Sequence, residues 1–223
     1  MYILYGGRFT RALITEMVMI EGDIAYELRR VDTVKGEHRS PEFLAINPAG
    51  MVPVLITPAG VTLTETPAIN LYLVDEHGLT DFAPRPDEAE RGPFLSGLFN
   101  LAGDLEPIMK QYFYPHRYVL RAEDTPAMKT KARDLALDRL GLIDRRLGEA
   151  GPYFLGKRFS LVDLTLAYWA ANIDFDDALE PYRALKRCVG LIMTRPKLVE
   201  KFAELCAWRA EYRQMQARGE GVD

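Results

Sequence analysis

Two short segments of the chain combine residue types that could bind an amino-acid-like ligand. Val52-Pro53 precedes an apolar run, and Glu65-Thr66 precedes Pro67. A proline in a strand removes a backbone donor from the ladder, so Pro53 is more typical of a strand edge or a cis peptide bond. In the cis form, Val52 would present its own N–H and C=O to an extended ligand. An ordinary trans proline at the end of an edge strand is the alternative.

The second segment offers opposite charges to a ligand that carries both an amine and a carboxylate. Thr66 could cap a helix beginning at Pro67, where the N–H groups of a helix start attract a carboxylate. Glu65 beside it could hold an ammonium. A γ-glutamyl group has both functions, so the pair matches such a ligand. The alternative is that Glu65, Thr66 and Pro67 form only a well-capped helix entry.

The elements that must position these residues fall into two parts. Residues 1–77 alternate between strand-like and helix-like patterns, which predicts an α/β domain with a crossover connection. The predicted order is βαβ followed by ββα: strands at 2–5 and 26–32 around a helix at 10–21, then a hairpin of strands at 52–57 and 61–64 and a helix at 67–75.

After this domain, strand patterns almost vanish. Residues 78–86 contain one glycine and two prolines and are predicted to be a linker. The rest, 87–223, is predicted to be an all-helical bundle domain that carries a second-substrate pocket. Its expected helices cover 88–112, 126–148, 161–175 and 196–216.

One motif in the helical part is structural rather than catalytic. Asp163 follows Ser160 by three residues, and the apolar Phe159 and Leu164 flank them. This is the spacing of a capping box with a hydrophobic staple at a helix start. We therefore do not interpret Ser160 and Asp163 as a catalytic pair.

Taken in order along the chain, these pieces resemble the glutathione S-transferase family, in its cytosolic, bacterial-type form. Tyr2–Tyr5 resembles the first strand of that family, and Gly36–Gly50 resembles the segment leading to its cis-proline. Glu65-Thr66 resembles its γ-glutamyl site, and Phe159–Ala167 its buried C-terminal helix. The resemblance covers essentially the whole chain. It implies a thioredoxin-like N-terminal domain, βαβ-ββα, followed by an all-α C-terminal domain.

The resemblance also implies a function. A member of this family would conjugate the thiolate of glutathione, its co-substrate, to a small hydrophobic electrophile, as in detoxification, and would form a homodimer. A glutathione-dependent peroxidase, ether-cleaving enzyme or isomerase on the same fold is one alternative. A noncatalytic ligand-binding or scaffold protein is another.

Such an enzyme must lower the pKa of a bound thiol from about 8.5. Thr10 is the first candidate for the hydrogen-bond donor, because it combines a hydroxyl with the positive start of a helix, and Tyr5 is the second. Alternatively, Thr10 only caps the helix and Tyr5 only packs. The position four residues before Arg11, where many relatives carry Ser or Cys, is Gly7. Arg8 or Arg11 could stabilise the thiolate, bind ligand carboxylates or simply be solvated.

Two further sets of residues follow from the resemblance. His38 and Arg39 match a pair that meets the glycine carboxylate of glutathione, whereas Met51 replaces a polar residue there. Tyr112 and His116, four residues apart, would share a helix face in the second-substrate pocket. Aromatic residues at helical spacing are also typical of a core.

Composition is consistent with this interpretation. The net charge is −4, and its interspersed charges argue against nucleic acid as a partner. Cys188 and Cys206 are expected to be buried free thiols, and with three histidines no metal site is expected. The start of the chain shows no signal pattern and no apolar run is long enough for a membrane span, which favours a cytoplasmic protein.

Overall fold

The computed structural model describes residues 1–8, 10–173 and 179–218. The described chain forms two compact units. The first contains Met1–Thr80 together with the segment from Thr194 onwards, and the second contains Asp81–Met193. The last helix therefore clusters with the residues of the sheet. The linker at 78–86 and the domain boundaries drawn from the sequence stay predictions.

The first unit is built on a four-stranded mixed sheet. Its strands are β1 (Tyr2–Gly6), β2 (Tyr26–Arg30), β3 (Val54–Ile56) and β4 (Thr62–Thr64). They lie in the order β2-β1-β3-β4, with β1 and β2 parallel and the other two pairs antiparallel. The predicted βαβ-ββα order and the thioredoxin-like fold class are confirmed.

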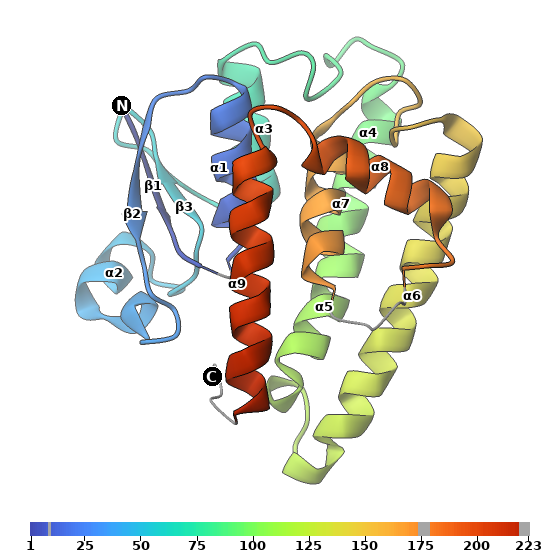
Figure 1. Ribbon diagram of the computed structural model, residues 1–223. Coiled ribbons are helices and arrows are strands. Elements are labelled where there is room, and N and C mark those ends of the chain that lie inside the picture. The colour runs from blue at the N-terminus through green and yellow to red at the C-terminus, as the bar shows by residue number, and fades with distance from the viewer. Residues whose placement is uncertain (9, 174–178, 219–223) are drawn as a thin grey trace. The chain divides into compact units, whose positions relative to one another are not determined.

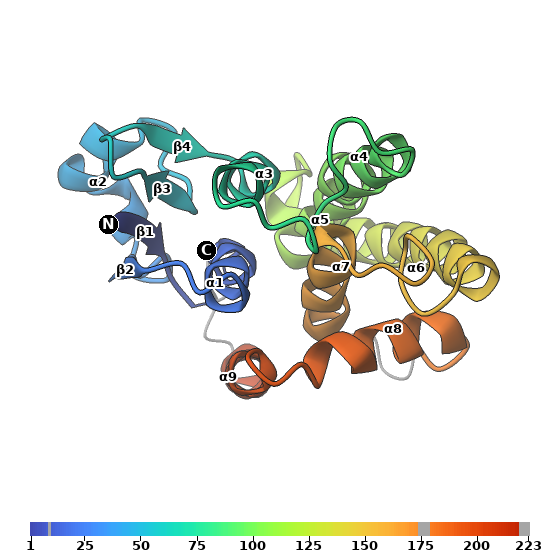
Figure 2. The ribbon, with the colours of Figure 1, turned by 90° about the horizontal axis from the view of Figure 1, so that it is seen from above.

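Helices cover both faces of this sheet. Figure 2 shows α1 (Ala12–Glu21) and α3 (Thr66–Glu76) on one face and α2 (Pro41–Ile46) on the other. The sequence patterns predicted α1 and α3 but missed α2 and the short 3-10 helix η1 (Glu37–Arg39) before it. Only Phe43 is buried in α2, so its six residues carry no helical apolar period.

The helix α9 (Val199–Ala217) completes the first unit and lies alongside α1 (Figure 1). Eight of the ten residues of α1 are buried, including the polar Thr15 and Glu16. A helix that is buried nearly all round must be covered on the side that faces away from the sheet. In this chain α3 packs against α1, and Lys201 of α9 pairs with the buried Glu16 of α1.

The second unit is all helical, as predicted. Its central helix, α7 (Leu161–Asn172), has eleven of twelve residues buried (Figure 1). The predicted helix at 88–112 is interrupted by a π-helical segment, η2 (Leu101–Leu105). The sequence analysis missed α8, and the end of the predicted 161–175 helix lies outside the described residues. The remaining helices are α4 (Arg91–Asn100), α5 (Glu106–Phe113), α6 (Thr125–Ala150), α8 (Arg183–Met193) and the 3-10 turns η3 (Pro115–Arg117) and η4 (Ala122–Asp124).

The capping box at the start of α7 is confirmed. The Asp163 carboxylate accepts hydrogen bonds from the Ser160 N–H at 2.8 Å, the Ser160 hydroxyl at 2.9 Å and the Phe154 N–H at 2.7 Å. Burial raises the pKa of Asp163 to about 6, although these hydrogen bonds oppose the shift. Every contact of the carboxylate serves the fold of this unit.

Both cysteines are free. Cys188 is buried as predicted, and its thiol lies 3.6 Å from Asp163 Oδ1. The prediction that Cys206 is buried is wrong, because it lies on the exposed side of α9. Within the described residues, no helix is both long enough and apolar enough to cross a bilayer.

Candidate functional site

Three strand ends bring the predicted ligand-binding residues together. Tyr5 of β1 pairs with Val54 of β3, and Val54 pairs with Thr64 of β4. Paired residues of neighbouring strands lie about 5 Å apart. Continued by one residue, this register puts Pro53 between Gly6 and Glu65. The loop after β1, the Val52–Pro53 pair and the start of α3 therefore meet at one end of the sheet.

The Val52–Pro53 peptide bond is cis, which confirms the geometry inferred from the sequence. The side chain of Val52 packs against a buried cluster that includes Tyr5 and Phe43. Asn47 holds the preceding turn, because its amide nitrogen donates to the Met51 carbonyl at 2.8 Å and its oxygen accepts from the Ala49 N–H at 3.2 Å. The sequence analysis assigned no role to Asn47. An Asn-Pro turn before a strand was the available signal.

The start of α3 differs from the prediction in one respect. The helix begins at Thr66 rather than Pro67, and the preceding residue is Glu65, whose φ of 67° is unusual for a residue other than glycine. Thr66 is therefore inside the first turn, and the prediction that it caps the helix is wrong. It is 4% exposed, and its hydroxyl oxygen has no hydrogen-bond partner among the described residues.

A buried hydroxyl without a partner costs free energy, of the order of 1–3 kcal/mol. Glu65 is exposed, and its side chain makes no capping hydrogen bond to α3. Positive-φ residues of this kind concentrate at ligand sites because the surrounding structure must hold them in place. The start of α3 is thus equipped to accept a carboxylate and an ammonium from outside the chain.

The first candidate for thiol activation, Thr10, lies in the loop between β1 and α1. Its hydroxyl donates to the Gly7 carbonyl at 2.7 Å and accepts from the Gly7 N–H at 3.2 Å. This pair of bonds closes the loop on itself. A Cβ atom at Gly7 would overlap the Val31 carbonyl oxygen. The backbone therefore excludes Ser or Cys from this position.

The second candidate, Tyr5, is buried on the face of the sheet that α2 covers. Its ring packs edge-on against Phe43, with 6.0 Å between centroids, and its hydroxyl accepts from Arg29 Nη1 at 2.9 Å. The Arg29 guanidinium also lies 5.6 Å from the centre of the Tyr5 ring. The Tyr5 hydroxyl is thus already engaged by a cation.

Arg39 and His38 lie in η1, close to the turn that leads to Val52. Arg39 Nη1 donates to the Ala49 carbonyl at 3.3 Å, which places this guanidinium beside residues 47–50. His38 is partly exposed, and Arg11 occupies the N-cap position of α1. Met51 is exposed, and its thioether side chain offers no strong polar group to a ligand.

Tyr112 and His116 do not share a helix face, so that prediction is wrong. The helix α5 ends at Phe113, and Tyr114 leaves the helical conformation with φ −128° and ψ 51°. Tyr112 is buried, with Lys129 Nζ 4.8 Å from its ring centre, whereas His116 is exposed. Their role in a second-substrate pocket stays a prediction. Among the described residues there is no group of three or more His, Cys, Asp or Glu side chains that could hold a metal ion.

Both halves of the chain match family models. Residues 1–75 match the N-terminal domain of glutathione S-transferase, and residues 126–216 match its C-terminal domain.

Two curated proteins illustrate the sequence similarity. A disulfide-bond oxidoreductase, YfcG of Escherichia coli, is 30% identical over 188 residues, which are 79% of this chain and 82% of the relative. A glutathione S-transferase domain-containing protein of Dictyostelium discoideum is 28% identical over 164 residues, or 68% of this chain. The match spans 58% of the length of the Dictyostelium protein.

Solved structures share the fold. A glutathione transferase homologue from Sulfitobacter, with bound glutathione, superimposes with a TM-score of 0.81 at 23% identity, covering 92% of this chain and 98% of the other. The bacterial glutathione transferase BphK, solved as a ternary complex, gives 0.75 at 27% identity, covering 93% and 99%. With the family models and the Escherichia coli relative, these likenesses show that the chain belongs to the glutathione S-transferase family.

Proposed function

We propose that the chain is a glutathione transferase that joins the thiolate of glutathione to a small hydrophobic electrophile. The observation that carries this proposal is the convergence of the cis Val52–Pro53 bond with Glu65 and Thr66 at one end of the sheet. The glutathione bound to the Sulfitobacter homologue supports the choice of ligand.

Each part of glutathione has a matching group in this chain. The start of α3 and the Thr66 hydroxyl would bind the γ-glutamyl carboxylate, and Glu65 would bind its ammonium. The N–H and C=O of Val52 would pair with the backbone of the cysteinyl residue. Arg39 would bind the glycine carboxylate, with His38 and Arg11 as further polar groups around the ligand.

The reaction needs the bound thiol in its thiolate form. Thr10 remains the first candidate for stabilising it and Tyr5 the second. Thr10 would exchange its bond to the Gly7 carbonyl for one to the sulfur, at the positive start of α1. The sulfur lone pair then attacks an electrophilic carbon, and the leaving group departs with the electrons of its bond. Tyr112 and His116 are proposed to line the site of that electrophile, in a cytoplasmic homodimer.

A second candidate reaction is the reduction of disulfides by glutathione. The name of the Escherichia coli relative favours it. The glutathione thiolate would attack one sulfur of a disulfide, releasing a thiolate and leaving a mixed disulfide. A second glutathione would attack the mixed disulfide and release oxidised glutathione. Neither reaction requires a cysteine of the protein.

Titration calorimetry with glutathione tests the binding part of the proposal. The wild-type protein is expected to bind the tripeptide, and Thr66→Val and Glu65→Gln are expected to weaken binding. Thr130→Val, which removes a hydroxyl bonded to the Pro126 carbonyl on an exposed turn of α6, is the matched control and should bind normally. Absence of binding heat in the wild-type protein at millimolar glutathione would overturn both candidate reactions.

Turnover then distinguishes the two reactions. We expect conjugation of aryl halides or epoxides, and weaker or no reduction of small organic disulfides. The opposite preference would replace the transferase by the disulfide-reducing enzyme. Binding without any turnover would indicate a noncatalytic ligand-binding protein.

A further inference from the structure

Arg8, in the loop after β1, is held by the C-terminal helix α9. Its Nη1 lies 3.4 Å from Glu211 Oε1, and its Nη2 pairs with the other oxygen of the same carboxylate. Its guanidinium carbon lies 5.4 Å from the centre of the Trp208 ring, a cation–π distance. Two side chains of α9 thus hold one cation of the loop.

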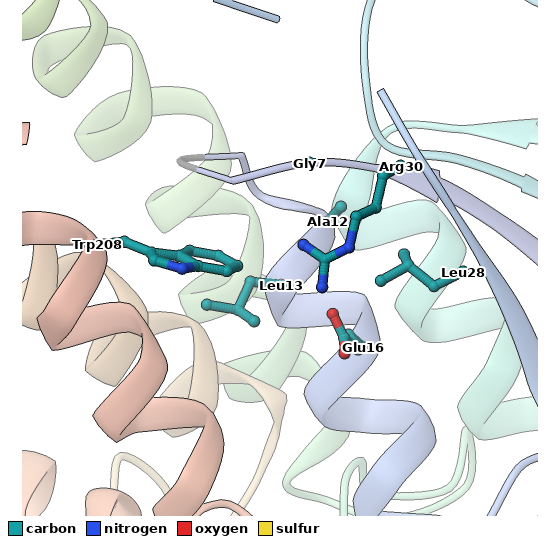
Figure 3. A pocket seen from close by; sticks show the side chains of 7 residues that line it. All are labelled: Gly7, Ala12, Leu13, Glu16, Leu28, Arg30 and Trp208. Atoms are coloured by element: carbon teal, nitrogen blue, oxygen red, sulfur yellow. The ribbon is translucent and has the colours of Figure 1, made fainter. Parts of the chain in front are cut away.

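The same helix closes the space beneath the loop. Figure 3 shows the indole of Trp208 beside Leu13 of α1, on the wall of a small cavity. The cavity measures about 10 Å³, which is room for roughly one water molecule. Its lining residues are Gly7, Ala12, Leu13, Glu16, Leu28, Arg30 and Trp208. Trp208 and Gly7 therefore line the same cavity, which is too small for a ligand.

The other end of α9 is anchored to α1 and the turn that follows it. Just before the helix, Arg195 pairs with both carboxylate oxygens of Glu21, at 2.8 and 2.7 Å. Lys197 Nζ lies 2.5 Å from Asp23 Oδ2, and Lys201 pairs with the buried Glu16. Because α9 is fixed at this end, Trp208 and Glu211 are presented to the loop from a rigid support.

The loop needs such a support. Gly6 and Gly7 follow one another, and glycine loses more conformational freedom on ordering than any other residue. The bonds between Thr10 and Gly7 link two residues of the loop, and the Arg8 side chain ties the loop to α9.

We infer that Trp208 and Glu211 position the thiol-activating loop by holding Arg8, so that α9 sets how well the site binds and ionises glutathione. This inference rests on the proposed function. It gives Arg8 the role of an anchor, which differs from the three roles that the sequence left open. Trp208 and Glu211 are positioning residues, since they act on the ligand only through the loop.

A double-mutant cycle distinguishes an anchor from a ligand-binding arginine. Arg8→Gln should raise the Kd for glutathione about three- to tenfold, the range expected for losing a cation–π contact and an exposed ion pair, and Glu211→Gln, which removes the ion pair alone, should raise it about two- to fivefold. Each should also raise the pKa of the bound thiol, followed by the ultraviolet absorbance of the thiolate. The double variant should be no worse than Arg8→Gln alone, because Arg8→Gln already removes the ion pair with Glu211.

A variant in which the two charges are exchanged provides a further test. Arg8→Glu combined with Glu211→Arg should restore part of the lost affinity. If Arg8→Gln weakens binding while Glu211→Gln and Trp208→Leu both leave it unchanged, Arg8 contacts the ligand directly and the inference is wrong.

A measurement without glutathione separates this inference from the proposed function. Hydrogen exchange of the peptide that carries Gly6, Gly7 and Arg8 should be faster in Glu211→Gln than in the wild-type protein. Asp124→Asn is the matched control, because it removes an exposed ion pair with Arg121 that involves neither α9 nor the loop, and it should leave that peptide unchanged. Equal exchange in Glu211→Gln and the control would overturn the tether even where glutathione binds. Failure of glutathione to bind would instead overturn the proposed function.

Discussion

The starts of α3 and α7 carry the same kinds of side chain but differ in their hydrogen bonds. At α7, the side chains of Ser160 and Asp163 bond to each other and to the backbone, which leaves the helix start closed. At α3, Glu65 makes no capping bond and the buried Thr66 hydroxyl has no partner among the described residues. Both places carry a hydroxyl and a carboxylate. Only α7 uses them for its own stability.

This difference in hydrogen bonding suggests that the start of α7 stabilises the fold and that the start of α3 is available to a ligand. A satisfied cap contributes about 0.5–2 kcal/mol, and a chain that leaves one open gives up that stability. The loss is understandable if a ligand supplies the missing partners. In this chain, the start of α7 is closed by its own side chains, and the start of α3 beside the cis-proline is open.

Removal of the acidic side chain should therefore destabilise the protein strongly at α7 and hardly at α3. We expect Asp163→Ala to lower the free energy of unfolding by about 3–5 kcal/mol, because several buried donors lose their acceptor. Glu65→Ala should change it by less than about 0.5 kcal/mol. Urea denaturation of both variants measures the contrast. Equal losses would mean that the α3 start is also a structural cap.

The pH dependence of stability tests the role of the buried Asp163 carboxyl group at the start of α7. The pKa of Asp163 is raised by burial from 3.8 to about 6, so the folded state binds this proton more tightly than the unfolded state. Its contribution to stability is complete below about pH 4 and is lost as pH rises through about 6, a change of about 3 kcal/mol. The stability of wild type minus that of Asp163→Asn should fall over this window. A difference that stays level from pH 4 to 7 would contradict the buried acid.

The loop after β1, at the same end of the sheet as the start of α3, allows a further prediction. Gly7→Ser should destabilise the protein by about 1–3 kcal/mol, because its Cβ overlaps the Val31 carbonyl. It should also reduce turnover rather than supply a thiol-activating hydroxyl. Gly92→Ala, at a helical glycine with open space around it, is the control and should be neutral or stabilising. Higher turnover in Gly7→Ser would show that the loop adapts to a side chain.

Removing the hydroxyl group at each helix start, Thr66 at α3 and Ser160 at α7, should give the smallest difference in stability between the two starts and the most specific one. Thr66→Val should leave the unfolding free energy unchanged or raise it by about 1 kcal/mol, because it removes an unsatisfied buried hydroxyl. Glutathione affinity should fall about tenfold. Ser160→Ala should do the reverse, costing about 1 kcal/mol of stability and leaving the affinity intact. A Thr66→Val protein that is both less stable and fully able to bind would contradict the open helix start.

The parts of this site that the sequence predicted are those specified by local chemistry. The cis bond before Pro53 and the Ser160–Asp163 box each depend on neighbouring residues, and both are confirmed. The Thr66 cap failed because the positive φ of Glu65 starts the helix one residue early, and residue types alone do not show that angle. The helix α2 failed because it is short and buries only Phe43.

Other features depend on contacts that no local pattern contains. Arg8 and Glu211 are 203 positions apart, so their pairing follows only from how α9 packs. Tyr112 and His116 have helical spacing, but the helix between them ends at Phe113. Spacing predicts a shared face only as far as the helix continues.

The most direct test of the open helix start compares two ligands on two proteins. Cysteinylglycine lacks the γ-glutamyl group of glutathione but keeps the thiol and the glycine carboxylate. The account predicts that wild-type protein binds glutathione much more tightly than cysteinylglycine by calorimetry, and that this preference largely disappears in the Glu65→Gln/Thr66→Val double variant. Equal affinity of the wild-type protein for the two ligands, or a preference that survives in the double variant, would contradict it.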